Sequence, residues 1–222
     1  MSAWMQTATG RDFVLRTPHV EPGHLFTEIA PALARIPRFN GHTVEAYSVA
    51  QHSVLCAEAA EDETGDLELA AYCLLHDAHE AYVGDITRPV IAALAEQLAD
   101  GVDPTTARLV GQSRAQHFHN SLHRVKAGID TEIAYAAGLD IDGLMRHRAT
   151  VMAIDLRALR TERDDLMLDG SRRWEGGVEG AVRLPVRTGR IRPLSETQAL
   201  AAFAEALQRL CPSTAAANPA RW

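Results

Sequence analysis

The sequence predicts an all-α fold with a short extended arm at its N-terminus. Three observations favour helices: aromatic residues make up only 5% of the 222 residues, alanine and leucine dominate, and several segments repeat apolar residues at helical spacing. Hydrophobic residues, at 46%, are sufficient for a sizeable core. We therefore expect one domain over residues 1–212 and a flexible, alanine-rich tail over residues 213–222.

The first predicted elements are the arm and one helix. Residues 1–20 alternate weakly between apolar and polar side chains, which is typical of an extended arm or a short hairpin. Apolar positions then recur at helical spacing over residues 25–36, and Pro37 should end this helix. Residues 38–42 follow as a polar turn that contains one aromatic side chain.

The next two predicted helices form the centre of the fold. Ser48 is followed three positions later by Gln51, which is the capping-box pattern and predicts a helix start. This helix should close in the acidic segment 58–66. A second helix is predicted over residues 67–82, with Gly84 as its C-cap, and it is apolar on nearly all sides. Such a helix belongs in the interior.

Four further helices complete the prediction, and two loops separate them. Residues 101–105 should break the chain between the first two of these helices, and residues 170–180 form a basic loop. The loop contains Arg172, Arg173 and Trp174 and is either a lid over a substrate or a plain surface loop. The predicted helices cover residues 89–99, 125–137, 144–168 and 195–210.

Three histidines in one segment invite a metal site that we discount. His117, His119 and His123 lie close together, but carboxylates that could support them as ligands are missing and their surroundings are polar. A solvated helix or loop is the better expectation here. The wider segment 97–122 has the character of an insertion that reshapes a pocket or an oligomer contact.

Composition limits the partners and the compartment. A net charge of −7 argues against stable nucleic-acid binding but allows a small phosphorylated ligand. The odd number of cysteines, Cys56, Cys73 and Cys211, is typical of reduced thiols in a cytosolic protein. No signal peptide and no apolar run of bilayer length is found, so we expect a cytoplasmic protein without membrane partners.

Metal-capable side chains lie inside three apolar segments. His76 and Asp77 interrupt the apolar run 74–82, and His52 lies on the inward stripe of the preceding helix. Asp155 lies on the apolar stripe of the late helix. Burying such groups is costly unless they are paired or bound to a metal. For Asp155 the alternatives are a metal or a salt bridge; its candidate partners are Arg148 and Arg163.

Taken together, these side chains predict a metal site. Two imidazole nitrogens and two carboxylates leave open positions for water and a substrate oxygen on a divalent ion. Manganese, cobalt, iron, nickel and zinc suit such ligands, and magnesium is less favoured. The residues alone therefore predict a helical metallohydrolase. The predicted ligands are His52, His76, Asp77 and Asp155.

The ordered motifs resemble a known family. A histidine, then a His-Asp pair, then a distant aspartate is similar to the HD-domain phosphohydrolases, a metal-dependent helical superfamily. The resemblance is closest to the branch of bacterial and prophage-encoded 5'-deoxynucleotidases, and it implies a single HD-domain helical bundle with the four ligands named above. The segments that support it are residues 38–42, 47–53, 75–82, 84–86 and 155–163.

The same resemblance implies roles for four further residues. Glu80 would orient or deprotonate the attacking water, and Asp85 would lie near the scissile phosphate or help to hold a second ion. Arg38 would contact the phosphate, and Phe39 would pack against the deoxyribose. These roles agree with the chemistry of phosphate hydrolysis, which needs an activated water, an acid or base and a cation.

One departure from the family concerns phosphate neutralisation. Relatives often have a lysine three residues before the late aspartate, where this chain has Met152. Neutralisation then depends on Arg38, with help from Arg148 or Arg88.

The predicted reaction converts a deoxynucleoside monophosphate to deoxynucleoside and phosphate. Two alternatives stay open: release of triphosphate from deoxynucleoside triphosphates, and a non-catalytic, metal-binding helical scaffold. The resemblance also implies a homo-oligomer, a dimer or larger, whose ligand is a small nucleotide.

Overall fold

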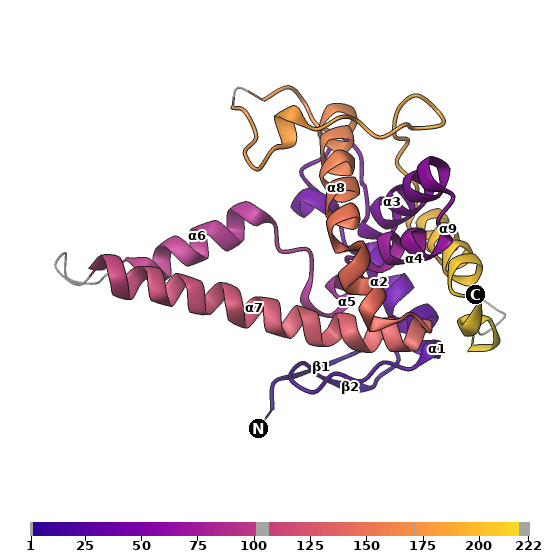
Figure 1. Cartoon of the computed structure of the whole chain (residues 1–222), viewed down its shortest axis with the longest axis horizontal. Coiled ribbons are helices and arrows are strands. Elements are labelled where there is room, and N and C mark those ends of the chain that lie inside the picture. Colours follow the sequence, from indigo (N-terminus) through magenta and orange to yellow (C-terminus); the bar gives the residue numbers. More distant parts are fainter. Residues whose placement is uncertain (1, 101–106, 171, 218–222) are drawn as a thin grey trace.

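The structure is a computed structural model that describes residues 2–100, 107–170 and 172–217 (Figure 1). Helices dominate it, and the two short strands β1 (Trp4–Gln6) and β2 (Asp12–Val14) pair as an antiparallel hairpin. The all-α fold with a short N-terminal arm is therefore confirmed. The breaker predicted at residues 101–105 lies outside the described residues.

A buried carboxylate attaches the hairpin to the helices. Glu28 accepts hydrogen bonds from Thr7 (2.8 Å), Thr9 (2.5 Å) and Arg11 (2.6 Å), and from Tyr82 (3.1 Å) on the opposite side. Burial alone would raise the pKa of Glu28, but the bonds from Arg11, Thr9 and Thr7 outweigh it and lower the pKa to about 2. The carboxylate therefore stays ionised while it joins the arm to the core.

The predicted helix 25–36 is divided into three parts. They are α1 (Pro22–His24), a π-helical turn η1 (Leu25–Ile29) and α2 (Ala30–Arg35). Pro31 explains the irregularity, because it has no backbone N–H and its ring crowds the carbonyl of the preceding turn. The helix ends before Pro37, as predicted.

Helix α3 (Val49–Thr64) begins and ends as predicted, but its cap is simpler than expected. The Ser48 hydroxyl accepts a hydrogen bond from the Gln51 amide at 3.3 Å, and Gly65 ends the helix with a φ of +67°. The Gln51 side chain does not return to the cap. It donates to the carbonyl of Arg192 and accepts from the amide of Leu194, so it ties α3 to a distant loop.

The continuous helix predicted over residues 67–82 is wrong. The chain forms α4 (Leu67–Leu75), then a turn, then α5 (Glu80–Val83), and Gly84 is the C-cap. In the turn, the amides of residues 78 and 80 bond to carbonyls three residues earlier, which is tighter than α-helical spacing. The Nδ1 atom of His76 also lies 2.7 Å from the Cys73 carbonyl oxygen. The imidazole thus donates a hydrogen bond to a carbonyl oxygen that would otherwise accept the next helical hydrogen bond.

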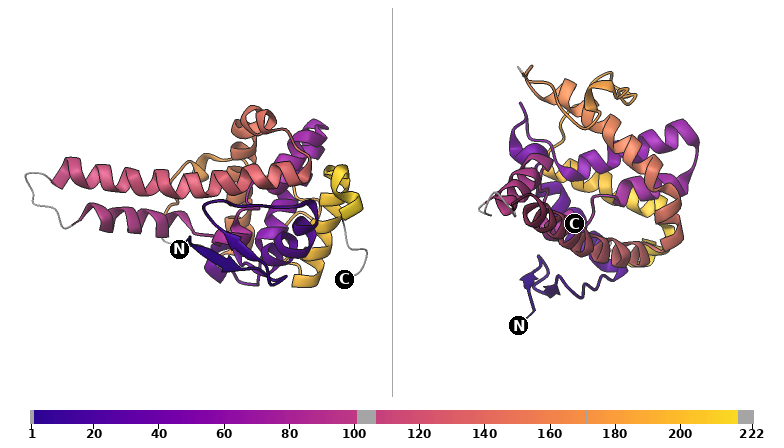
Figure 2. Two further views of the ribbon diagram at one scale, coloured as in Figure 1. Left: turned by 90° about the horizontal axis from the view of Figure 1, so that it is seen from below. Right: turned by 60° about the vertical axis from the view of Figure 1, so that its left-hand side comes forward.

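Helices α6 (Arg88–Ala99) and α7 (Ala107–Ala137) run side by side and project from the rest of the molecule (Figures 1 and 2). Helix α7 is far longer than the predicted 125–137 and contains much of the segment interpreted as an insertion. The side chains that stand exposed along it include His117, His119 and His123, as expected for a solvated helix.

The last third of the chain crosses the core and returns to it. It comprises α8 (Ile141–Leu166), the short turn η3 (Val178–Gly180), α9 (Glu196–Leu210) and η4 (Pro212–Ala217). The described residues of the predicted tail, up to Ala217, belong to η4: the Ser213 hydroxyl donates to the Ala137 carbonyl, and Thr214 is buried.

The core lies where α2, α3, α4, α8 and α9 pack around one another. Within the described ranges, every helix is too short or too polar to span a lipid bilayer. The largest fully buried apolar side chains are Tyr47, Phe13, Phe26, Phe203, Leu25, Ile29, Leu33, Leu74, Ile129, Ile133 and Leu207.

Candidate metal centre

Three elements bring the four predicted ligands together. His52 comes from α3, His76 and Asp77 come from the turn between α4 and α5, and Asp155 comes from α8; one ligand atom from each lies within 4.8 Å of all the others. His52 Nε2 is 3.3 Å from His76 Nε2 and 3.4 Å from Asp155 Oδ1. His76 Nε2 is 3.2 Å from Asp77 Oδ2. Donors bonded at about 2.0–2.2 Å to one ion are separated by about 3 Å or more, so the set could hold a divalent metal.

The orientation of both imidazoles favours metal binding. His52 Nδ1 lies 2.5 Å from Glu162 Oε1, and His76 Nδ1 lies 2.7 Å from the Cys73 carbonyl oxygen. Because each Nδ1 donates to an acceptor, each Nε2 presents its lone pair to the centre of the cluster. The sequence analysis gave Glu162 no role. Its spacing of seven residues from Asp155, two turns along one helix face, was the available signal.

The two aspartates are held in the charged form that a cation needs. Burial alone would raise both pKa values, but the neighbouring imidazoles outweigh it. His76 lowers the pKa of Asp77, and His52 together with His76 holds the pKa of Asp155 well below its usual range. Against the effect of burial, the carboxylates in turn raise the pKa of both imidazoles. A divalent cation would take the place of the protons on the two Nε2 atoms.

Arg38 lies among carboxylates. Its guanidinium is 3.3 Å from Glu162 Oε2, 3.5 Å from Asp77 Oδ2 and 3.9 Å from Asp85 Oδ2. It also lines the cavity above the cluster, so it is close enough to the predicted phosphate position to act there. Arg38 therefore has a second role that the sequence did not indicate: its charge offsets the repulsion among the buried Glu162 and the partly buried Asp77 and Asp85.

Glu80 and Asp85 also line this cavity, next to the metal-capable cluster. Burial, and the charges of Asp77 and Asp85, raise the pKa of Glu80 to about 9. Burial likewise raises the pKa of Asp85. One buried oxygen of Glu80, Oε2, has no hydrogen-bond partner within the described residues. A cation bound beside this oxygen would stabilise the ionised form of Glu80. The oxygen without a partner therefore also fits a metal site.

The cavity has a volume of about 1030 Å³, and two of the four candidate ligands, Asp77 and Asp155, line it. Arg88 NH2 lies 3.9 Å from Asp155 Oδ2, and it is this arginine, not Arg148 or Arg163, that pairs with Asp155. The salt-bridge partners predicted for Asp155 are therefore wrong. The cationic side chains that line the cavity are Arg38, Arg88, Lys126, Arg172 and Arg173.

The position of Lys126 on the cavity wall was not predicted, because nothing in the sequence places the middle of α7 beside the metal-capable cluster. Phe39 lines the same cavity and adopts a φ of +56°, which is uncommon for a residue with a side chain. Met152, which replaces the lysine of relatives, is 57% exposed and does not line the cavity.

Comparison with known proteins agrees with this geometry. Residues 40–140 match the family model described as HD domain. The chain is 31% identical over 154 residues to the uncharacterized protein YfdR of Escherichia coli, which covers 68% of this chain and 65% of that protein. It is 40% identical over 112 residues to an uncharacterized protein of Rhodobacter capsulatus, which covers 47% of this chain and 55% of that protein.

The chain thus spans less than two thirds of the length of either relative. The matched segment contains three of the four predicted ligands, and Asp155 follows it. Proteins of the HD-domain family bind divalent metals and are metal-dependent phosphohydrolases. Over residues 40–140 the chain is thus similar to an HD domain, and a cluster of His and Asp side chains, three of them within this segment, could hold a divalent metal ion.

Proposed function

We propose that the protein is a 5'-deoxynucleotidase, which converts a deoxynucleoside monophosphate to the deoxynucleoside and phosphate. One observation is the main support: four metal-capable side chains from three elements meet at the base of a cavity that also contains Glu80 and several cations. The resemblance of the motifs to the deoxynucleotidase branch supplies the choice of substrate.

His52, His76, Asp77 and Asp155 would hold the ion. A mixed imidazole and carboxylate set suits manganese, cobalt, iron, nickel or zinc, with magnesium less favoured. When bound, such an ion lowers the pKa of water and polarises a phosphoryl oxygen. Glu162 would keep the His52 ring in the orientation that exposes Nε2.

Glu80 receives the proton of the attacking water. In the proposed step, an oxygen–phosphorus bond forms to water and the bond from phosphorus to the 5' oxygen breaks. The proton from water passes to the Glu80 carboxylate, the form that a bound cation would favour, and Glu80 then donates this proton to the leaving 5' oxygen. Asp85 lines the same cavity wall and would lie near the scissile phosphate.

Cations and one ring hold the rest of the substrate. Arg38, Arg88 and Lys126 face the cavity and would neutralise the phosphoryl oxygens. Phe39 would pack against the deoxyribose.

Release of triphosphate from deoxynucleoside triphosphates is the second candidate. A cavity of about 1030 Å³ has space for a longer phosphate chain, and Arg172 and Arg173 add positive charge to its wall. The reaction products separate this candidate from the first.

The deciding experiment is product analysis on metal-stripped protein. Deoxynucleoside mono-, di- and triphosphates are incubated with manganese, cobalt, zinc or magnesium, with Asp155→Asn as the inactive control. Phosphate released from monophosphates only with a transition metal would support the nucleotidase. Intact triphosphate would identify the second candidate, and no product with any metal would leave the helical scaffold.

We also propose that the chain forms a homo-oligomer, as the family resemblance implies. Light scattering coupled to size-exclusion chromatography measures the molar mass directly. A mass equal to that of one chain, 24.2 kDa, at micromolar concentration would contradict this expectation.

A further inference from the structure

Two aromatic rings extend the site away from the metal-capable cluster. Arg38 lies 3.5 Å from Asp77, and its guanidinium lies 5.5 Å from the centre of the Phe39 ring. The Phe39 ring in turn lies 6.0 Å from the Trp174 ring, at an interplanar angle of 63°. All four residues line the same cavity. The order along the wall is therefore carboxylate cluster, cation, first ring, second ring.

A nucleotide has the same order of chemical groups. If its phosphate lies at the cluster, its sugar lies beside Phe39 and its base extends to Trp174. Phe39 keeps a left-handed backbone conformation, with a φ of +56°, and such conformations cluster at ligand sites because the surrounding structure must offset their cost. Trp174 has no role in the metal-capable cluster, since its side chain is not a metal ligand and carries no charge.

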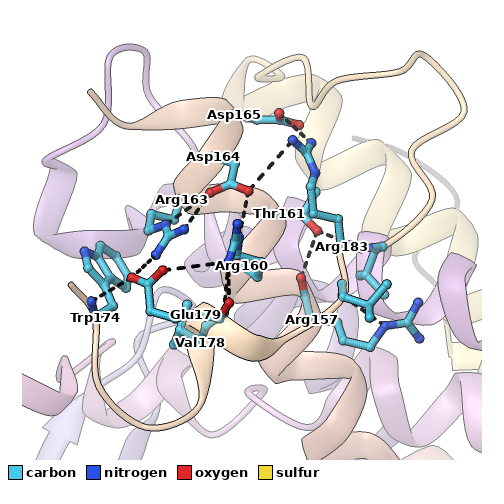
Figure 3. A network of polar contacts seen from close by, with 12 residues as sticks. Arg157, Arg160, Thr161, Arg163, Asp164, Asp165, Trp174, Val178, Glu179 and Arg183 are labelled. Carbon is cyan, nitrogen blue, oxygen red and sulfur yellow. Dashed lines mark hydrogen bonds and ion pairs between the residues drawn. The ribbon is translucent and has the colours of Figure 1, made fainter. Parts of the chain in front are cut away.

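The Trp174 backbone is attached to helix α8, which also provides Asp155. The Trp174 amide donates to Glu179 Oε1 at 2.9 Å, and Arg163 NH1 donates to the same oxygen at 2.6 Å (Figure 3). The Glu179 carbonyl accepts from Arg160 NH1 at 2.9 Å. Glu179 therefore joins the loop to helix α8 through both its side chain and its backbone carbonyl.

The ring itself is held as well. The Arg163 guanidinium lies 5.9 Å from the centre of the Trp174 ring, and Val178, between Trp174 and Glu179, is only 1% exposed. A plain surface loop needs no such attachment. The contacts thus hold an aromatic ring on the wall of the cavity that Asp77 and Asp155 also line.

We propose that Trp174 is the platform on which the base of the substrate stacks, and that Glu179 and Arg163 position it. The proposal rests on the proposed function and deepens it, because it assigns the cavity's outer half to a purine or pyrimidine base. Stacking on an aromatic ring is tolerant of base identity, since every base has a π-face. The protein should therefore require a base but discriminate weakly among bases.

The test compares a substrate with a base and one without. Parent and Trp174→Ala, both loaded with metal, are assayed with deoxynucleoside monophosphates and with deoxyribose 5-phosphate. We expect Trp174→Ala to raise KM for the nucleotides about tenfold or more, with kcat little changed, and to leave deoxyribose 5-phosphate unaffected. Trp174→Phe should retain most of the affinity. Equal KM values for parent and Trp174→Ala would overturn the proposal.

Positioning is tested on Glu179. Glu179→Ala should raise the nucleotide KM as Trp174→Ala does, while Glu179→Gln, which keeps an acceptor for the Trp174 amide, should restore part of the affinity. The matched control is Glu61→Gln, which breaks an exposed ion pair with Arg209 on the opposite side of the fold. If Glu179→Ala leaves KM unchanged, Glu179 has no positioning role.

A binding measurement separates this proposal from the proposed function. Trp4 and Trp222 are replaced by Phe, so that Trp174 is the single tryptophan of the chain. The metal-loaded protein is titrated with a deoxynucleoside phosphonate, in which a methylene group replaces the bridging 5' oxygen and prevents cleavage. Saturable quenching by this probe, but not by deoxyribose 5-phosphate, supports the platform even if no nucleotide is hydrolysed. Absence of quenching in a protein that hydrolyses nucleotides overturns it.

Discussion

At the scale of single residues, the carboxylates of the site have different protonation states and roles because their environments differ. Asp77 and Asp155 stay ionised beside imidazoles, Glu162 holds His52, and burial next to other acids raises the pKa of Glu80. Groups of one chemical type thus differ in protonation because their neighbours differ. Each assignment can be tested by an amide that keeps the shape and removes the charge.

Glu80→Gln should leave metal binding nearly unchanged and lower kcat about a hundredfold or more, because the amide cannot accept the proton from water. Metal content is measured after dialysis, and kcat from phosphate release. Equal turnover of variant and parent would remove Glu80 from the mechanism.

Glu162→Gln should weaken metal binding about ten- to a hundredfold, because a neutral amide is a weaker acceptor for the His52 Nδ1–H and no longer forms an ion pair with Arg38. Competition with a chelating indicator gives the affinity, and circular dichroism confirms that the variant is folded. Glu61→Gln, which removes the charge of a half-buried glutamate paired with Arg209, is the matched control. An unchanged affinity would show that the charge of Glu162 is not needed to orient His52.

At the scale of elements, short interruptions decide where the functional side chains point. In a continuous α-helix His76 and Asp77 would diverge by about 100°. The tight turn after α4 instead brings His76 Nε2 to 3.2 Å from Asp77 Oδ2. The turn costs helical hydrogen bonds, and the contact of His76 with the Cys73 carbonyl offsets part of that loss.

The attachment of the hairpin to η1 makes a prediction about pH. Glu28 has a folded pKa of about 2, below its ordinary value of 4.5, so its stabilising effect is present above pH 4.5 and is lost as the pH falls toward 2. Glu28→Gln should lower the free energy of unfolding by about 2 kcal/mol at pH 7, since charge-assisted hydrogen bonds are lost. Urea unfolding at several pH values should show the difference between parent and variant shrinking from pH 5 to pH 2. A constant difference would contradict the assignment.

At the scale of the whole molecule, the candidate metal ligands connect distant parts of the chain. His52, the His76–Asp77 pair and Asp155 are separated by many residues, and they meet only because α3, α4 and α8 pack together. An ion bound by all four would therefore stabilise the folded state as a whole.

Metal removal should accordingly lower the thermal midpoint. A hundredfold excess of ion over its Kd stabilises by about 2.7 kcal/mol, which corresponds to roughly 5–10 °C for a chain of this size. Scanning calorimetry with chelator and then with added manganese or zinc measures the shift. Asp155→Asn should respond much less, and an equal response of parent and variant would place the ion elsewhere.

The sequence predicted local features well where a single residue type decides them. Ser48 and Gly65 define the ends of α3, and the break before Pro37 is present, because capping and the missing N–H of proline act within one turn. Helix α6 was predicted as residues 89–99, but the full length of α7 and its pairing with α6 were not, since the apolar pattern of α7 is weak and its contacts with α6 are tertiary.

What the sequence determined by itself is the helical class and the residue types of the site: buried His and Asp in apolar helical segments are costly unless something binds them. The tertiary structure decided how these residues meet. It broke the helix at His76, placed Glu162 behind His52, and put Lys126 and Trp174 on the cavity wall. The physical reason is that helical periodicity determines which face a side chain occupies, whereas the distance between faces of different helices depends on packing.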